Sequence, residues 1–415
     1  MAVDLLIRNG RLIDPGSGRD EILDVAISAG TIGQIARGIP AAGAGQVIDA
    51  SGALVTPGLI DSHTHLFRGS DFFGIDPDSV AWQSGVTTWL DAGSAGAFRM
   101  PAFREQVIER SEVTVRALIN ISYLGVAGMN YDEYCNPATC NVDLLERVVD
   151  VHRDVIVGIK TRMGSDGVGY QGTLPLVKAV EASQRTGLPI MCHISGSPPS
   201  IDNVLGKLRA GDTVTHAFTA AGERLIDSRR RIKPSVRRAR DAGVRFDIGH
   251  GAGSFSFISA EALTAQGFWP DSISTDLHQL SLPGPRLVED GEQISRVRGD
   301  GAPQLTLLTV MTKLLFLGMP LAEVIRATTS TPAAMFGLAD RGVLRPGARA
   351  DVAILELEPG PIELFDVFGE TRRYDQKLAC RATILNGVPM TPRPVPTPPP
   401  WIRMIDQEPP SARPA

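Results

Sequence analysis

Cysteine and long apolar runs are both scarce in this chain of 415 residues. Its four cysteines, Cys135, Cys140, Cys192 and Cys380, show no paired spacing, so we expect no disulfide framework and a reducing compartment. Asp4 interrupts the first apolar run, which argues against a signal peptide, and no later run approaches membrane-spanning length. We therefore expect a cytoplasmic protein that does not contact a membrane.

The chain also lacks a positive charge balance. Its formal net charge is −5, whereas a nucleic-acid-binding surface needs an excess of lysine and arginine. One basic run, "RRRIKPSVRRAR" at 229–240, stands apart. We interpret it as the solvated face of a helix that starts near Pro234. A small-molecule substrate is therefore expected, and nucleic acid is not.

The chain shows two kinds of sequence pattern. Residues 1–55 and 341–388 alternate apolar and polar positions between Asn-Gly and Pro-Gly turns, which predicts one β-sandwich built from both chain ends. Residues 56–340 alternate β-branched runs with helical patterns such as "TLPLVKAVEASQRTG". Residues 389–415 are rich in proline and are expected to be extended or disordered. This tail covers either its own chain or a neighbouring subunit, which leaves a homo-oligomer open.

The middle part has eight predicted strands. The first leads into "DSHTHLF", and the others lie at 86–93, 113–122, 155–160, 189–194, 212–218, 244–251 and 271–278. Eight strand–helix units predict an α/β fold, a (β/α)₈ TIM-type barrel. An open doubly wound sheet would need a glycine-rich phosphate loop after its first strand, and "DSHTHLF" is not one.

Chemically unusual side chains stand where these strands end. His63 and His65 are two residues apart, so they point to the same side of a strand. The carboxyl ends of barrel strands meet at one face, where the active sites of this fold lie. Imidazole and carboxylate groups converging there predict a site for divalent metal. The six predicted ligands are His63, His65, Lys160, His193, His216 and Asp276.

Lys160 is an unusual candidate, because an ammonium group would repel a metal ion. A lysine without solvent and near a cation loses its proton easily, and the free amine can add carbon dioxide. The resulting carbamate could bridge two metal ions. On this hypothesis His63 and His65 hold one ion together with Asp276, and His193 and His216 hold the other. Asp276 would also move a proton from the attacking hydroxide to the leaving group.

The motifs "VTPGLIDSHTHLF", "GIK", "MCHIS", "VTHAF" and "STDLH", between sandwich strands at both ends, closely resemble the amidohydrolase superfamily. The resemblance is to its dihydroorotase/hydantoinase-like branch with a carboxylated lysine. It covers nearly the whole chain except the tail. "GVTTWLDAGSAGA", "GIKTRM" and "FDIGHGAGSFSF" are similar to the amidohydrolase/deacetylase group within that branch. The resemblance implies a binuclear centre, usually of zinc, and hydrolysis of an amide or ester.

Two neighbouring side chains are candidates for substrate binding. Arg162 lies two residues past Lys160, and its planar guanidinium suits a substrate carboxylate. A rim salt bridge is the alternative for Arg162. His250, within "GHGAG", is predicted to donate a hydrogen bond to the substrate, and a purely structural loop histidine is the alternative. His278 is expected to support the site without binding metal, and His152 is expected at the surface.

The cysteines are not expected to be catalytic. Cys135 and Cys140 have no second pair nearby, so two thiols in a loop are expected rather than a zinc clip. Cys192 precedes His193, and strand alternation turns it toward the layer between barrel and helices. A buried, inert thiol is predicted there.

The predicted activity is hydrolysis of an acyl group on a small carboxylate, such as an N-acyl amino acid or an O-acetyl hydroxy acid. The first alternative is a cyclic amidohydrolase that opens a dihydroorotate-, hydantoin- or imide-like ring. The ring-opening relatives usually carry arginine two residues after the histidine pair, where this chain has Phe67, followed by Arg68. The second alternative is a non-catalytic scaffold of the same fold.

Overall fold

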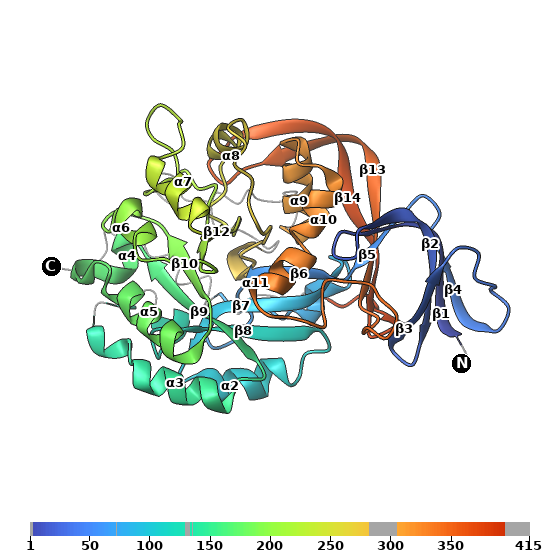
Figure 1. Cartoon of the computed structure of the whole chain (residues 1–415), viewed down its shortest axis with the longest axis horizontal. Helices are drawn as coiled ribbons and strands as arrows, with labels where there is room; N and C mark the ends of the chain where they lie inside the picture. The colour runs from blue at the N-terminus through green and yellow to red at the C-terminus, as the bar shows by residue number, and fades with distance from the viewer. Residues whose placement is uncertain (1–2, 72, 129–132, 135, 282–304, 395–415) are drawn as a thin grey trace.

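The computed structural model describes residues 3–71, 73–128, 133–134, 136–281 and 305–394. Two sheets organise these residues (Figure 1). One sheet is built from both ends of the chain and the other from its middle, as the sequence predicts. The tail from residue 395 onward lies outside the described residues.

The first sheet joins the two chain ends. Its strands run in the order β15-β14-β13-β5-β1-β2-β3, and β4 also pairs with β1. The early strands are β1 (Val3–Asp14), β2 (Arg19–Ser28), β3 (Thr31–Ala36), β4 (Ala44–Asp49) and β5 (Leu54–Pro57). The late strands are β13 (Val352–Phe365), β14 (Thr371–Leu385) and β15 (Val388–Pro389). The junction is the antiparallel pair β5–β13, where Val55 faces Ile354, so blue and red strands lie side by side in Figure 1.

Inward-facing aliphatic side chains of both chain ends form the core of this sheet, among them Ile7, Val25 and Ile354. We expect Ile7→Ala to lower the free energy of unfolding by about 2–5 kcal/mol, because Ile7 is fully buried and the cavity would not close completely. Ile22→Ala is the matched control, since Ile22 is 62% exposed. Denaturant unfolding measures both. Equal effects of the two substitutions would contradict a packed core around Ile7.

The second sheet is the parallel barrel wall. Its strands run in the order β12-β11-β10-β9-β8-β7-β6. They are β6 (Leu59–Thr64), β7 (Val86–Gly96), β8 (Thr114–Asn120), β9 (Ile156–Met163), β10 (Ile190–Ile194), β11 (Thr213–Thr215) and β12 (Arg245–Phe246). Segment 272–277 closes the wall, because isolated parallel bridges join Asp247 to Ser272 and Thr64 to Leu277. The eighth predicted strand is therefore present as a short closing segment, and the barrel prediction is confirmed.

Helices cover the outside of the barrel. Their bounds are α1 (Asp78–Ala81), α2 (Met100–Phe103), α3 (Val142–Val151), α4 (Ser165–Val168), α5 (Leu174–Thr186), α6 (Ile201–Leu205), α7 (Pro234–Asp241), α8 (Phe257–Thr264), α9 (Leu307–Phe316), α10 (Leu321–Arg326) and α11 (Ser330–Met335). Asn141 caps α3 by accepting a hydrogen bond from Leu144 N. In the described part of the chain, each helix is too short or too polar to span a membrane.

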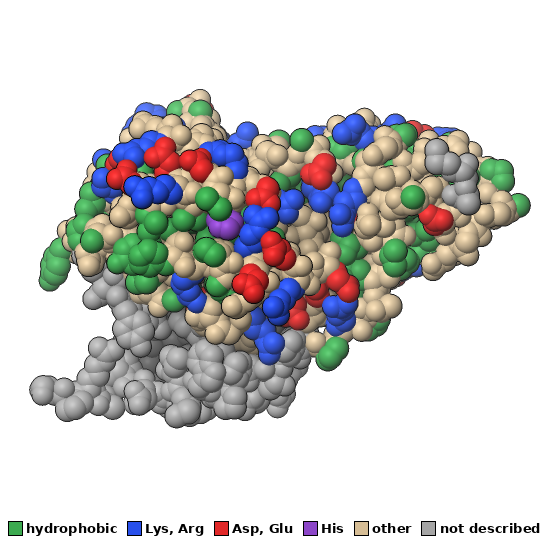
Figure 2. Space-filling model, turned by 90° about the horizontal axis from the view of Figure 1, so that it is seen from below, with side chains coloured by type: hydrophobic (Ala, Val, Ile, Leu, Met, Phe, Trp, Pro, Cys, Tyr) green, Lys and Arg blue, Asp and Glu red, His purple; other side chains and the backbone are tan. Residues whose placement is uncertain are grey.

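The basic run at 229–240 is helical only from Pro234 onward, so the predicted solvated helix face covers only its second half. Helix α7 begins at Pro234 within this run. Its arginines Arg237 and Arg238 are exposed, whereas Val236 and Ala239 are buried. The face seen in Figure 2, which carries α2 and α3, likewise has acidic and basic side chains interspersed. Ion pairs in this part of the chain include Arg104–Asp154, at 2.7 Å.

Candidate metal centre

The predicted ligands meet at one end of the barrel wall. The imidazole centroids of His63 and His65 are 5.8 Å apart, and those of His63 and His216 are 5.1 Å apart. The ring of His193 lies 4.3 Å from that of His216. Ligand atoms of His63, His216 and Asp276 all lie within 4.8 Å of one another. The structure thus brings imidazoles from three separate strand ends and one carboxylate around a common point.

Asp276 and Lys160 complete this cluster. Asp276 Oδ1 lies 3.3 Å from His63 Nε2 and 3.2 Å from His65 Nε2. Lys160 Nζ lies 2.9 Å from His63 Nε2 and 3.7 Å from the Met191 sulfur. Each of the six predicted ligands therefore lies beside at least one of the others, and together they form one continuous cluster.

Two of the candidate ligands have a left-handed backbone. His216 has φ of 68° and Asp276 has φ of 49°, values that residues other than glycine rarely adopt. Asp276 follows Thr275, whose N–H and hydroxyl both donate to the buried carboxylate of Asp61, at 3.0 and 2.6 Å. These two hydrogen bonds fix Thr275, the residue that precedes the left-handed backbone of Asp276. Local strain at these two positions is the kind of feature that clusters at functional sites.

Hydrogen bonds at Nδ1 set the tautomers of the imidazoles. Thr215 donates its hydroxyl hydrogen to Asp247 at 2.7 Å, so its oxygen accepts from His63 Nδ1 at 2.8 Å. His216 Nδ1 donates to Gly249 O at 2.7 Å, because a carbonyl oxygen can only accept. Both rings therefore carry a lone pair on Nε2, the nitrogen that faces the cluster. Such outer hydrogen bonds are typical of metal-binding histidines.

The protonation states also suit a cation. Burial lowers the pKa of His216 to about 3, and burial lowers that of His193 well below its usual value, so both rings are neutral at pH 7. Burial alone would raise the pKa of Asp276, but the neighbouring imidazoles, His63 first, outweigh it and hold the pKa well below its usual range. The carboxylate of Asp276 is therefore ionised beside the neutral ring of His216.

Two imidazole nitrogens point to a missing partner. Among the described residues, nothing accepts from or donates to His193 Nε2 or His216 Nε2, although both atoms are buried. A buried polar atom without a partner is unfavourable, and native proteins rarely leave one. Lone pairs on neutral imidazoles beside a carboxylate are the ligands that zinc prefers. The residues present therefore fit a divalent metal ion.

Lys160 is enclosed and only 1% exposed. Burial lowers its pKa to about 8, so roughly a tenth of the amine is neutral at pH 7, far more than for a lysine in water. Its Nζ faces the cluster rather than solvent, at 2.9 Å from His63 Nε2. A neutral amine at this position can react with carbon dioxide, as the sequence hypothesis requires.

Three buried carboxylates beneath the cluster do not appear among the predicted site residues. Asp61 holds Thr275, as described above, and burial raises its pKa to about 7. Asp247 accepts from Thr215 and from the hydroxyls of Ser272 and Ser274 at 2.6–2.8 Å. Asp91 accepts from Leu66 N and Ser94 N, and Ser94 Oγ lies 3.0 Å from His65 Nδ1. The only signal in the sequence is their place: each lies on or just after a strand that leads to the site.

Arg162 is held in an ion pair. Its Nη1 donates to Glu133 Oε2 at 2.8 Å, and the Glu133 side chain is fully buried. Glu133 Oε1 also accepts from Asn120 Nδ2 at 2.8 Å. In the sheet register Arg162 stands opposite His193, which places it at the same end of the wall as the cluster. The charge of Arg162 is thus matched by Glu133, and a substrate carboxylate would share this arginine with it.

His250 does not have the hydrogen-bonding freedom that its predicted role needs. Its Nδ1 lies 2.8 Å from Gly251 O, so it must donate to that carbonyl. Its Nε2 lies 2.6 Å from Lys313 Nζ. Both ring nitrogens are therefore engaged within the protein, and no N–H remains for a substrate. Donation from His250 to a substrate would require one of these two contacts to be exchanged, so this role stays a prediction.

The remaining histidines are peripheral to the cluster. His278 is buried, and its ring lies 6.5 Å from that of His65 and 4.7 Å from that of Phe73. His152 follows α3 and is half-buried, with Nδ1 3.5 Å from Arg104 Nη1. The position of His278 agrees with a supporting rather than a ligating role, whereas His152 is half-buried and not fully at the surface as predicted.

The described cysteines, Cys140, Cys192 and Cys380, lie in surroundings that disfavour a thiolate, because burial raises the pKa of each. Cys192 is buried and burial raises its pKa, as expected for an inert thiol. Burial also raises the pKa of Cys140 to about 11. Cys135 falls outside the described residues.

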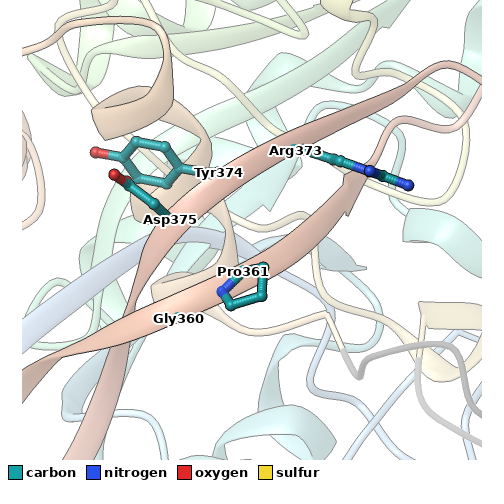
Figure 3. Close-up of a pocket in the computed structure, with 5 residues that line it drawn as sticks. All are labelled: Gly360, Pro361, Arg373, Tyr374 and Asp375. Atoms are coloured by element: carbon teal, nitrogen blue, oxygen red, sulfur yellow. The ribbon is translucent and has the colours of Figure 1, made fainter.

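A separate hollow lies on the hairpin β13–β14 (Figure 3). It is lined by Gly360, Pro361, Arg373, Tyr374 and Asp375. In Figure 3, Tyr374 and Asp375 lie together while Arg373 points away from them. None of these residues is a predicted ligand, and the hollow offers no convergent donor set. The barrel cluster, and not this hollow, therefore gathers the groups that could bind a metal ion.

Comparison with known proteins supports the same assignment. Residues 54–387 match the model of the amidohydrolase family. A protein of Brucella anthropi named deacetylase is 31% identical, with 94% of this chain and 93% of the relative covered. A dihydroorotase of Citrifermentans bemidjiense is 27% identical, with 85% and 90% covered.

Solved structures agree. A crystal structure titled as an adenine deaminase superposes with a TM-score of 0.82 and 31% identity, covering 93% of this chain and 99% of the other. One titled as a dihydroorotase gives 0.81 and 28%, with the same coverage. With the barrel, the second sheet and the His-rich cluster in place, these matches show that the chain belongs to the amidohydrolase family and is a hydrolase acting on C–N bonds.

Proposed function

We propose that this hydrolase is a metal-dependent deacetylase that removes the acyl group from a small carboxylate-bearing substrate, an N-acyl amino acid or an O-acetyl hydroxy acid. The observation that carries the proposal is the cluster itself. Neutral imidazoles from three strand ends, a buried lysine and a carboxylate converge there, and two buried imidazole nitrogens have no partner among the described residues. The relatives named deacetylase support the type of bond cleaved.

Two ions of zinc are the proposed cofactors. His63, His65 and Asp276 would hold one, and His193 and His216 would hold the other. When bound, such ions supply a nucleophile at neutral pH and polarise the acyl carbonyl. Lys160 would join both sites as a carbamate. Its neutral amine adds carbon dioxide through a new N–C bond and releases one proton, which leaves two carboxylate-like oxygens.

Asp276 is the proposed proton carrier. Its Oδ1 lies beside His63 and His65, and its pKa is held low, so a carboxylate is available to accept a proton. Asp276 accepts this proton from the attacking water at a carboxylate oxygen and delivers it to the leaving nitrogen or oxygen. Breaking of the C–N or C–O bond then leaves a neutral amine or alcohol.

The substrate class rests on Arg162, which stands at the same end of the barrel wall as the cluster. Arg162 is the proposed partner of the substrate carboxylate, alongside Glu133. Dihydroorotase-named relatives make ring opening of a cyclic amide the second candidate. Phe67 argues against it, because this side chain is buried, its ring packs 5.1 Å from that of Phe103, and the Arg99 guanidinium lies 5.0 Å above it. The position where ring-opening relatives usually carry arginine thus faces the core here.

A paired substrate screen tests the proposal. Zinc-loaded enzyme is offered N-acetyl amino acids, their C-terminal amides and cyclic amides. We expect turnover of the free carboxylates, weaker turnover of their amides, and a loss of this preference in Arg162→Met. Exclusive ring opening would replace the proposal with the second candidate. Absence of zinc after growth in zinc-containing medium would favour a non-catalytic scaffold.

A further inference from the structure

A buried lysine in helix α9 contacts the loop that follows β12. Lys313 is 6% exposed, and its Nζ lies 2.6 Å from His250 Nε2. The same Nζ lies 5.1 Å from the ring centroid of Phe255, which stacks on His250 at 4.8 Å with an interplanar angle of 9°. Among the described residues, no carboxylate oxygen comes within ion-pair distance of Lys313 Nζ. His250 and Phe255 are therefore the groups that hold this amine.

The direction of the Lys313–His250 hydrogen bond follows from the other ring nitrogen. His250 Nδ1 carries the hydrogen, because it faces the carbonyl oxygen of Gly251 at 2.8 Å. In the neutral ring Nε2 is then an acceptor, so Lys313 is the donor. The His250 ring is fixed on three sides: by Gly251 O, by Lys313 and by the face of Phe255.

The loop that carries His250 contacts two of the candidate metal ligands. Gly249 O accepts the hydrogen bond from His216 Nδ1 at 2.7 Å. A Cβ on Gly251 would lie only 2.6 Å from Asp276 Oδ2. Both glycines have positive φ, 47° and 55°, and glycine is the residue with the greatest backbone freedom. Gly249 N also donates to Ser274 Oγ at 3.0 Å and Gly251 N to Thr275 O at 2.7 Å. His250 supplies the only side chain of segment 249–251 and adds an anchor on the side of helix α9.

We propose that Lys313 is a positioning residue for the metal centre: by holding His250, it fixes backbone 249–251 against His216 and Asp276. Helix α9 would thus help to set the geometry of the ligands from outside the cluster. The inference rests on the proposed function in so far as His216 and Asp276 bind metal. It does not depend on which substrate is hydrolysed.

The test uses the full-length protein and two substitutions at one position. Lys313→Met keeps the length of the apolar stem and removes the donor, whereas Lys313→Gln keeps a neutral N–H donor. Lys178→Met is the matched control, because Lys178 is a half-exposed surface lysine of α5 paired with Glu181. The readouts are zinc affinity by competition with a chelator, the visible spectrum of the cobalt-substituted protein, and kcat and KM on any substrate found.

We expect Lys313→Met to weaken zinc affinity about tenfold, as loss of an orienting hydrogen bond typically does, and to alter the cobalt spectrum. Lys313→Gln should recover most of both, and kcat should fall more than KM rises. A His250→Phe variant should show the same loss, and adding Lys313→Met to it should cause no further loss. The single His250→Phe variant still decides the matter if Lys313→Met fails to fold: unchanged zinc affinity and cobalt spectrum in it would overturn the proposal.

Unchanged zinc affinity and cobalt spectrum in Lys313→Met would overturn the proposal. A rise in KM alone would also overturn it, and would instead make Lys313 a partner of the substrate carboxylate. The metal readouts need no turnover. Failure of the proposed deacetylase activity and failure of the Lys313 inference are therefore separate outcomes.

Discussion

Asp276→Asn should lower kcat/KM by about 10³-fold on any substrate that the wild-type protein hydrolyses. The asparagine amide has nearly the same shape as the carboxylate but accepts no proton at neutral pH. It also removes the negative charge that lies 3.2–3.3 Å from the Nε2 atoms of His63 and His65. We therefore expect weaker metal binding together with the loss of proton transfer.

Steady-state kinetics and metal analysis on the same preparation separate these two effects. Asp20→Asn is the control, because Asp20 is an exposed strand residue paired with Arg11 at the surface of the first sheet. Saturating zinc should restore occupancy in Asp276→Asn without restoring turnover. Turnover within tenfold of wild type at full occupancy would rule out Asp276 as the proton carrier.

Lys160→Gly should reduce zinc from two equivalents per chain to one or fewer and lower kcat/KM by about 10³-fold or more. Mutation of a residue that only orients a metal ligand already lowers metal affinity or activity roughly 10- to 100-fold. Loss of the proposed bridging group should therefore have a larger effect. The substitution also opens a cavity, because the Lys160 stem is fully enclosed. Short carboxylic acids such as acetate or propionate fit the space left by a carbamate.

Chemical rescue then identifies the group that Lys160 presents. If the lysine acts as a carbamate, short carboxylates should restore part of the zinc and of the activity, and alkylamines of the same length should not. Lys160→Met, which fills the cavity, should resist rescue and serves as the control. Rescue by alkylamines instead would show that the bare amine is the active form. Labelling with ¹³C-bicarbonate and a carbamate resonance in the wild-type protein provide an independent readout.

The candidate ligands were predictable because barrel topology converts sequence position into spatial position. His63, Lys160, His193 and His216 stand on or directly after strands of one parallel sheet, so their common location follows from strand order alone. The joining of the two chain ends in one sheet was predictable for a similar reason. Apolar strand-like runs within 3–14 and 352–365, bounded by turn residues, each need a partner to cover them.

The roles of Arg162 and His250 depended on partners far away in sequence. Arg162 pairs with Glu133, 29 residues earlier, and His250 pairs with Lys313, 63 residues later. Neither partner follows a strand pattern that would mark it. Lys313 lies in an apolar helix, where the sequence pattern alone would place a lysine at the border of the exposed face. Its burial becomes visible only when α9 is packed in the structure.

The sequence by itself determined the barrel, the composite sheet and the set of candidate ligands, because periodicity and strand order are properties of local runs of residues. Tertiary structure decided the tautomers of His63 and His216, the turning of Asp276 by Asp61 and Thr275, and the engagement of both nitrogens of His250. These features depend on single hydrogen bonds between distant elements. The direction of a hydrogen bond follows from which atoms meet, and chain folding alone brings those atoms together.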